Sequence, residues 1–183
     1  MKNKIIIAVI ATAFAIGAYV AYRLYKSSQL SPRDTASFSY QGLDLKVDYG
    51  RPSKRGRVIF GEASSNALQP NGKYWRLGAN APTEVTFSKN IAFAGKPVNA
   101  ATYRLYCVPS ASSWQLYLNS EIDSFSGASE PDHTLDILTV EIPLEMSESA
   151  VEQFTIEFSS NSKGASMNLM WDRALVKVPI AIQ

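Results

Sequence analysis

The stretch Leu43-Asp44-Leu45-Lys46-Val47-Asp48-Tyr49 alternates apolar and polar side chains without interruption. A period of two places the apolar side chains on one face of a β-strand, where they can be buried. The same alternation recurs in later segments, which are 85–87, 103–108, 114–118, 137–142, 154–158, 167–171 and 175–182. The sequence therefore predicts an all-β domain.

Turn-forming residues separate these segments and supply the backbone angles that tight turns need. They are Gln41-Gly42, Gly50-Arg51-Pro52, Pro70-Asn71-Gly72, Gly95-Lys96-Pro97, Pro109-Ser110 and Ser162-Lys163-Gly164. After residue 30, only 145–152 offers a helix, of one or two turns. Strands at this spacing without intervening helices predict an antiparallel β-sandwich or jelly-roll-like single domain, with a barrel as the alternative.

Size and composition fit one domain. The chain has 183 residues, 46% of them hydrophobic and 19% charged, which is typical of a globular protein. We assign 1–29 to a targeting segment and 30–183 to the single β-sandwich domain, with 27–36 as a short tether between them. The one cysteine, Cys107, excludes an intrachain disulfide framework and a multi-cysteine zinc site. Its place on a predicted strand indicates a buried small side chain.

The N-terminal segment carries an uncharged, mostly apolar run at residues 5–22. As a helix this run spans about 27 Å, close to the thickness of the hydrocarbon core of a bilayer. Tyr19 and Tyr22 near the end of the run and Tyr25 just after it lie at positions suited to the membrane interface. The sequence thus predicts one hydrophobic helix that anchors the protein in a membrane through residues 5–22.

Two other interpretations of this segment stay open. A cleaved signal peptide needs a small-x-small site, and the best candidate, Ile16-Gly17-Ala18, lies inside the apolar run. A buried core helix is the other. Lys2 and Lys4 ahead of the run favour a cytoplasmic N-terminus. The body is then expected to face the periplasm or cell exterior, or to be secreted if the signal is cleaved.

The charge distribution excludes one class of partner. Four basic and no acidic residues lie in 1–29, which leaves 14 basic and 16 acidic residues in 30–183 and a net charge of −2 there. A nucleic-acid-binding domain is expected to carry a basic excess over its folded part. We therefore predict no nucleic-acid partner.

Two motifs stand out from an ordinary β-domain: Tyr49-Gly50-Arg51-Pro52-Ser53-Lys54-Arg55-Gly56-Arg57 and Trp75-Arg76-Leu77-Gly78-Ala79-Asn80. In both, the chain resembles a bacterial family of exported proteins that is known only as a domain of unknown function. It departs from the family pattern at Ala101, where glycine is usual, and at Pro82, near a usually acidic position. The resemblance implies an exported β-sheet protein, and it supplies no catalytic residue.

The motifs and the residue before the second one provide the candidate ligand-binding residues, which are Tyr49, Arg51, Arg55, Arg57, Tyr74, Trp75, Arg76 and Asn80. Guanidinium groups bind carboxylates, phosphates and sulfates through two parallel hydrogen bonds and stack on aromatic rings, so this set fits a glycan or an anionic small ligand. The alternative is structural: Arg76 pairs with Glu84 or Asp48, Trp75 belongs to the core and Asn80 closes a turn.

For catalysis the sequence selects no residue. The only histidine, His133, lies in a polar loop. A solvated side chain is a simpler interpretation of this histidine than membership of a Ser-His-Asp triad. Glu130, Asp132 and Asp136 lack the regular spacing of a calcium loop. We therefore predict no metal and no cofactor.

From these observations we expect an extracytoplasmic cell-envelope β-sandwich protein with a non-catalytic ligand-binding or accessory role. One alternative is a hydrolase acting on a cell-envelope polymer. Another is an assembly module that pairs through the edges of its sheets. The oligomeric state is not predicted.

Overall fold

One helix precedes a body made of strands. The computed structural model describes residues 2–122, 129–161 and 164–183. The helix is α1 (Lys2–Leu30), and two short 3₁₀ turns are η1 (Ala63–Ser65) and η2 (His133–Leu135). The strands are β1 (Arg33–Tyr40), β2 (Leu43–Gly50), β3 (Phe60–Gly61), β4 (Gln69–Pro70), β5 (Thr83–Phe87), β6 (Ile91–Phe93), β7 (Lys96–Val98), β8 (Thr102–Pro109), β9 (Ser113–Asn119), β10 (Asp136–Pro143), β11 (Glu145–Asn161) and β12 (Gly164–Ile182).

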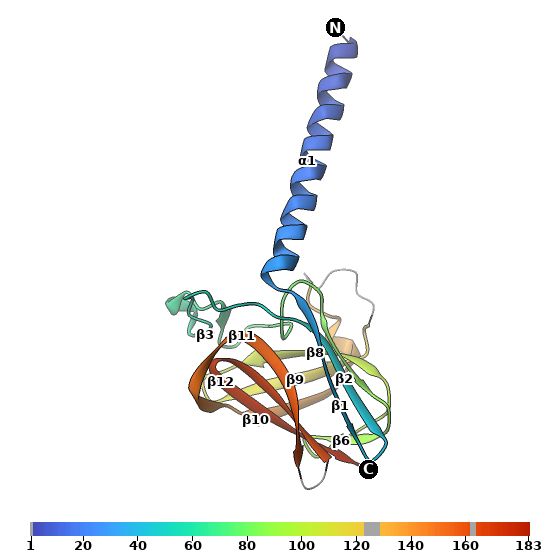
Figure 1. The fold of residues 1–183 in the computed structure, drawn as a ribbon, viewed down its shortest axis with the longest axis vertical. Coiled ribbons are helices and arrows are strands. Elements are labelled where there is room, and N and C mark those ends of the chain that lie inside the picture. Colours follow the sequence, from blue (N-terminus) through green and yellow to red (C-terminus); the bar gives the residue numbers. More distant parts are fainter. Residues whose placement is uncertain (1, 123–128, 162–163) are drawn as a thin grey trace.

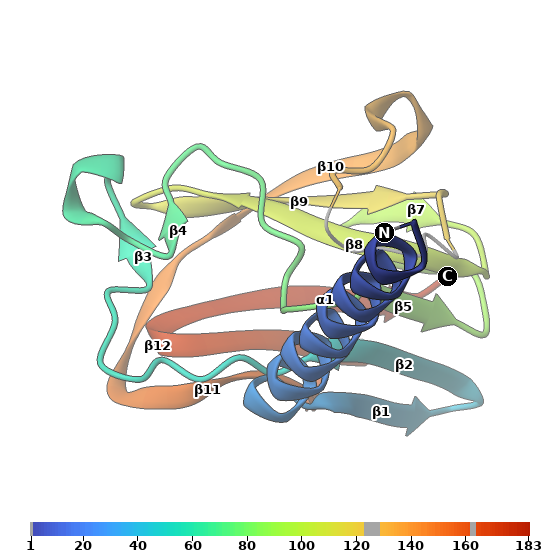
Figure 2. The same ribbon diagram turned by 90° about the horizontal axis from the view of Figure 1, so that it is seen from above.

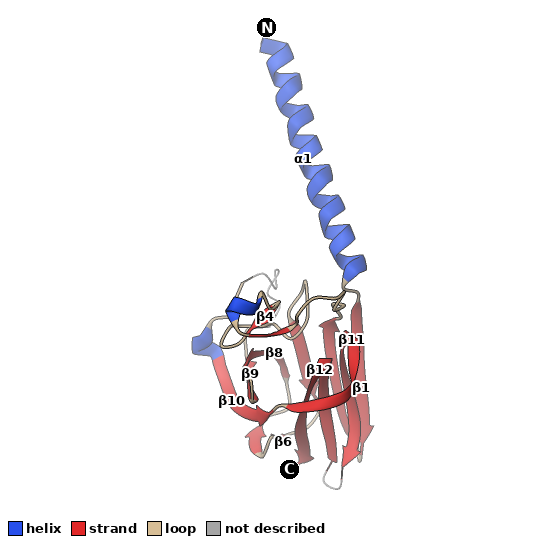
Figure 3. Ribbon diagram, turned by 90° about the vertical axis from the view of Figure 1, so that its left-hand side faces the viewer, coloured by secondary structure: helices blue, strands red, loops and turns tan. Residues whose placement is uncertain are grey.

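The strands form two antiparallel sheets. The large sheet has the order β1-β2-β5-β8-β9-β10, and the small sheet has the order β11-β12-β6-β7. The large sheet curves, so that β1 at one edge lies near β11 and β10 at the other edge lies near β12 (Figures 1 and 2). β3 and β4 form a short parallel pair outside both sheets. The prediction of a single all-β domain behind one apolar helix is confirmed (Figure 3).

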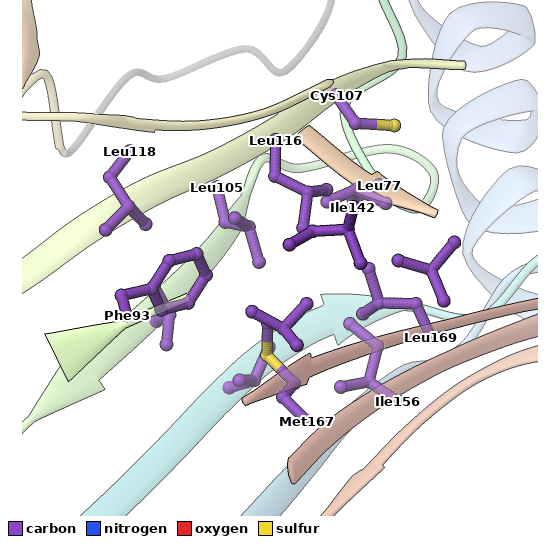
Figure 4. Close-up of a cluster of buried hydrophobic side chains, with 14 of the residues drawn as sticks. Leu77, Phe93, Leu105, Cys107, Leu116, Leu118, Ile142, Ile156, Met167 and Leu169 are labelled. Carbon is purple, nitrogen blue, oxygen red and sulfur yellow. The ribbon is translucent and has the colours of Figure 1, made fainter. Parts of the chain in front are cut away.

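The core lies between the two sheets. Alternate residues of β2, namely Leu43, Leu45 and Val47, are fully buried, as the period of two predicts. Leu105 and Leu116 of the large sheet face Ile156, Met167 and Leu169 of the small one (Figure 4). Each buried aliphatic side chain contributes about 1.5–3 kcal/mol, so this interface supplies most of the stabilisation of the fold.

All eight alternating segments lie in strands, and Cys107 is buried as expected, which raises the pKa of its thiol. The predicted turn at 162–164 falls partly outside the described residues.

Three sequence-based expectations about local structure are wrong. The turn expected at 95–97 lies at 94–95, and Lys96 and Pro97 pair with β6 as the beginning of β7. The segment 27–36 is no tether, since α1 continues to Leu30 and β1 begins at Arg33. β1 pairs with β2 along its whole length, but as an edge strand it is only half buried and its sequence lacks strong alternation. The segment 145–152 is the beginning of β11 rather than a helix. Its pairing with β12 determines its conformation, while its polar side chains stay largely exposed.

A buried tyrosine joins the two sheets. The Tyr49 side chain leaves β2 and is only 1% exposed. The backbone N–H of Ile156 donates to the phenol oxygen (2.9 Å), and the phenol donates to the Ile156 carbonyl (3.2 Å). Tyr49 thus occupies the outer edge of β11, where a further strand would otherwise pair. Burial raises the pKa of this phenol, so it stays protonated and keeps its donor.

The helix α1 extends away from the sandwich and only its C-terminal end contacts the domain (Figures 1 and 3). The helix over residues 4–30 is long and apolar enough to cross a membrane, and none of its side chains is buried. The interpretation of the segment as a core helix is therefore wrong. A signal anchor and a signal peptide both agree with the exposed apolar helix.

Replacing Tyr49 by Phe tests the connection between the sheets. Tyr49→Phe leaves the N–H and carbonyl of Ile156 buried without a partner, and each unsatisfied buried group costs about 1–3 kcal/mol. We expect a clearly lower free energy of unfolding in chemical denaturation. Tyr40→Phe is the matched control, because its hydroxyl meets only the exposed Gln41 side chain. Equal stability of the two variants would contradict this role of Tyr49.

Candidate functional site

The second motif is positioned by a buried tryptophan. Trp75 forms two backbone hydrogen bonds with Cys107 of β8, at 2.8 and 2.9 Å, so it extends the sheet beyond the end of β5. Its ring is 3% exposed and lies 5.4 Å from the Trp114 ring and 5.6 Å from the Trp171 ring. The residues on either side of Trp75 point the opposite way, because side chains alternate along an extended segment.

The two motifs cross at their glycines. A Cβ atom on Gly50 would lie only 2.2 Å from the carbonyl oxygen of Ala79, and one on Gly78 would lie 2.8 Å from the carbonyl oxygen of Gly50. Gly78 also has a φ of +151°, which other residues rarely adopt. The motif glycines therefore allow a backbone contact that holds the two motifs against each other.

A cleft of about 350 Å³ lies beside this crossing. Its volume falls within the range of small-ligand sites. Its lining consists of Ser31, Pro52, Arg57, Leu68, Gln69, Tyr74, Trp75, Arg76, Gly78, Ala79 and Asn80. Five of the eight sequence-predicted residues, Arg57, Tyr74, Trp75, Arg76 and Asn80, meet here, and Trp75 contributes only a small part of its surface.

The two arginines of the cleft are held by backbone carbonyls. Arg57 donates from Nε to the Lys54 carbonyl (3.0 Å) and from Nη2 to the Ser53 carbonyl (2.6 Å). Arg76 donates from Nη1 to the Asn80 carbonyl (3.0 Å). A carbonyl orients a guanidinium group without neutralising its charge, so both groups remain able to attract an anion.

Neither arginine forms an ion pair with a residue that the structure describes. The alternative that Arg76 pairs with Asp48 is wrong, because Asp48 pairs with Lys46 at 2.7 Å. Within the described part of the chain, Glu84 forms no ion pair with Arg76 either. No carboxylate is present among the described residues that line the cleft.

Arg55 and Asn80 contact the end of α1. Arg55 Nη2 donates to the Leu30 carbonyl (3.3 Å), and Ser27 Oγ donates to Asn80 Oδ1 (2.7 Å). The Asn80 amide nitrogen is also within 3.4 Å of the Ser27 and Ser31 carbonyls. The Leu30 carbonyl is at the end of the helix, where carbonyls lack partners inside the helix, whereas the Ser27 carbonyl also accepts the Ser31 N–H (3.1 Å). The motifs thus bind the end of α1 as well as lining the cleft.

Tyr49 and Arg51 lie apart from the cleft. Arg51 donates to the Phe154 carbonyl (3.2 Å), to Thr155 Oγ1 (3.0 Å) and to the Asp34 carboxylate (3.0 Å). Its guanidinium group therefore connects β1 with β11, as Tyr49 connects β2 with β11. In this structure both residues hold the sheets together, and all their observed partners are internal.

A second polar cluster on the outer face of the large sheet was missed by the sequence analysis. The Arg104 side chain is 1% exposed and donates from Nη2 to the Tyr74 hydroxyl (2.9 Å) and to the Ser129 carbonyl (2.7 Å). Its Nε and Nη1 atoms have no partner among the described residues. The alternation on β8 was the available signal, because it places Arg104 and Tyr106 together on the outer face of the sheet. Alternation could not show that loops distant in the sequence cover and bury this face.

His133 belongs to the same face. Tyr106 donates to the Asp136 carboxylate (2.6 Å), and its oxygen lies 2.8 Å from His133 Nδ1. His133 Nε2 lies 3.3 Å from the Glu130 carboxylate. Burial and the bond to Asp136 raise the pKa of Tyr106, so this phenol is a poor acid. His133, Tyr106 and Asp136 do not line the cleft, and the described residues form no metal-binding cluster.

The fold and the cleft define a class of protein: an all-β domain that follows an apolar helix and carries a basic cleft where the two meet. The chain belongs to the family described as "Protein of unknown function (DUF2911)", whose model matches residues 31–180. Searches of the curated proteins and of the solved structures found no match to the chain.

The single histidine gives a pH-dependence that can be measured directly. Its bonds to Glu130 and then Asp136 raise the pKa of His133 above 6.5, since imidazolium alone can donate from both ring nitrogens. The stabilisation is fully present below the unfolded-state pKa and is lost as the pH rises through the folded-state pKa. We expect His133→Asn to lower the melting temperature more at about pH 5 than at about pH 8. The effect should be small, because the side chain is 54% exposed.

NMR titration of the one imidazole signal provides the control. The pKa of His133 should fall in Glu130→Gln, because the carboxylate that raises it most is then replaced by an uncharged amide. A titration midpoint at or below the unfolded-state value in the wild type would contradict the assigned hydrogen bonds.

Proposed function

We propose that the protein is a membrane-anchored extracytoplasmic binding protein whose cleft takes an anionic or acidic sugar ligand. The observation that carries the proposal is the pair Arg57 and Arg76, which line one cleft without a carboxylate among its described lining residues. Guanidinium groups already oriented by carbonyls lose little conformational freedom when an anion binds. The Tyr74 ring in the same lining offers a surface on which a sugar can stack.

A hydrolase is supported less well by this geometry. Hydrolysis of a glycan needs two carboxylates on opposite sides of one bond, or a nucleophile beside a base. Arg57 and Arg76 supply neither function. The groups with acid or base chemistry, His133 and Asp136, are bound to Tyr106 on the outer face of the large sheet.

Thermal unfolding with small anions tests the cleft. For the full chain in neutral detergent, phosphate, sulfate or glucuronate should raise the melting temperature, while glucose serves as the uncharged comparison. A ligand at a hundredfold excess over Kd stabilises the folded state by about 2.7 kcal/mol. The shift should disappear in Arg57→Ala and Arg76→Ala and should weaken at high salt, since screening reduces charge attraction.

Two further variants separate binding from stability. Arg51→Ala removes the connection to Asp34 and Phe154, so it should lower the melting temperature without ligand and keep the ligand-induced shift. Lys89→Ala removes an exposed charge that contacts the Gln41 carbonyl at the distant β1–β2 turn, and it should change neither quantity. A ligand shift that survives in Arg57→Ala and Arg76→Ala would contradict the proposed site.

Membrane attachment is tested by fractionation of cells that express the full chain. The run 5–22 contains no charged residue, so its insertion in a bilayer is favourable. We expect the protein in the membrane fraction after washing with carbonate, and protease added to the outside should degrade the body. A mature N-terminus after residue 18 by mass spectrometry would show a cleaved signal instead of an anchor.

A further inference from the structure

Three hollows connect the membrane-spanning part of α1 with the cleft. The first runs along the last turns of the helix, and the second lies between the helix end and Arg55. The first and second hollows share Ser27 and Leu30, and the second hollow shares Ser31 and Arg57 with the cleft. Neighbouring hollows share lining residues, so they follow one another from the helix surface to the family motifs, and we call this row of hollows the path.

The path is lined by basic side chains along its whole length. They are Arg23 and Lys26 on the helix, Arg55 and Arg57 after β2, and Arg76 in the second motif. No acidic side chain is among the described residues that line any of the three hollows. The Glu152 carboxylate at this end accepts the backbone N–H of Arg55 (2.8 Å) and forms no ion pair with these cations in the described structure.

The path lies at the height of lipid headgroups. From the end of the apolar run at Tyr22 to Leu30, the helix adds about 12 Å, whereas the headgroup layer on one side of a bilayer is about 5–8 Å thick. Arg23 and Lys26 therefore lie within that layer, and the hollow at Leu30 opens just above it. Arg55, which donates to the Leu30 carbonyl, is held at this boundary.

We propose that this path binds the phosphate-bearing headgroup of an anionic membrane lipid. The inference rests on the proposed function of the cleft and names its ligand class. The acyl chains lie along the apolar helix beside Tyr19 and Tyr22, and the phosphate meets Arg23 and Lys26. The outer part of the headgroup reaches Arg57 and Arg76. Because the row of hollows begins on the apolar helix itself, the path favours a lipid over a soluble anion of the same chemistry.

The test uses the full chain in phosphatidylcholine nanodiscs, with and without phosphatidylglycerol that carries a photoactivatable group on its headgroup. We expect cross-links to peptides that contain Arg57 or Arg76. The double variant Arg57→Ala, Arg76→Ala should reduce cross-linking by about tenfold, the order expected for the loss of charge-assisted hydrogen bonds. The matched control is the double variant Lys89→Ala, Lys96→Ala, which also removes two positive charges. Both lysines are exposed and do not line the path: Lys89 contacts the Gln41 carbonyl and Lys96 contacts the Thr139 carbonyl.

If the double variant does not fold, a competition experiment with the wild-type protein alone still tests the inference. In that case, unlabelled phosphatidylglycerol should compete for cross-linking and phosphatidylcholine should not. Cross-linking that is equal in the wild type, the double variant and the lysine control would overturn the inference. If glycerol phosphate in solution raises the melting temperature through Arg57 and Arg76 while no lipid is captured, the cleft binds a soluble anion and the lipid inference is wrong. If neither probe acts through these residues, the proposed function fails as well.

Discussion

The burial of Trp75 is the constraint on which the site depends. Its ring lies between Trp114 of the large sheet and Trp171 of the small sheet, so it fills the core at the end of the sandwich nearest α1. Two hydrogen bonds to Cys107 keep the segment extended. With Trp75 directed inward, alternation directs Tyr74 and Arg76 outward to the cleft wall. The same interaction therefore closes the core and orients the side chains proposed to bind ligand.

The motif arginines divide by the kind of partner that each one meets. Arg51 pairs with the Asp34 carboxylate and with groups of β11, so its charge is neutralised and it connects the sheets. Among the described residues, Arg57 and Arg76 donate to carbonyl oxygens and form no ion pair, so their charges remain available. Arginine thus stabilises the fold at position 51 and makes the cleft positive at positions 57 and 76.

The sequence predicted most of the buried strands, but not the short buried strand β6, and it missed the segments whose conformation depends on pairing partners. Alternation located β2, β8 and β12, because burial of one face imposes the period of two. It could not locate β1 or the beginning of β11, since polar edge segments become strands only through pairing. For the same reason, the motifs identified Arg57 and Arg76 as candidates but could not separate them from Arg51, whose partners are about a hundred residues away.

The cleft also depends on the buried face beside it. The Tyr74 hydroxyl accepts a hydrogen bond from Arg104, and its ring lies 5.3 Å from the Tyr106 ring, so this wall of the cleft has fixed partners on the outer face of the large sheet. Arg57 and Arg76, which also line the cleft, have their guanidinium groups tethered to backbone carbonyls. An exposed arginine without a tether loses rotamer freedom worth about 2 kcal/mol on binding. Because these lining side chains are ordered before a ligand arrives, much of this cost is met in folding, and weak contacts to a single anion can suffice for binding.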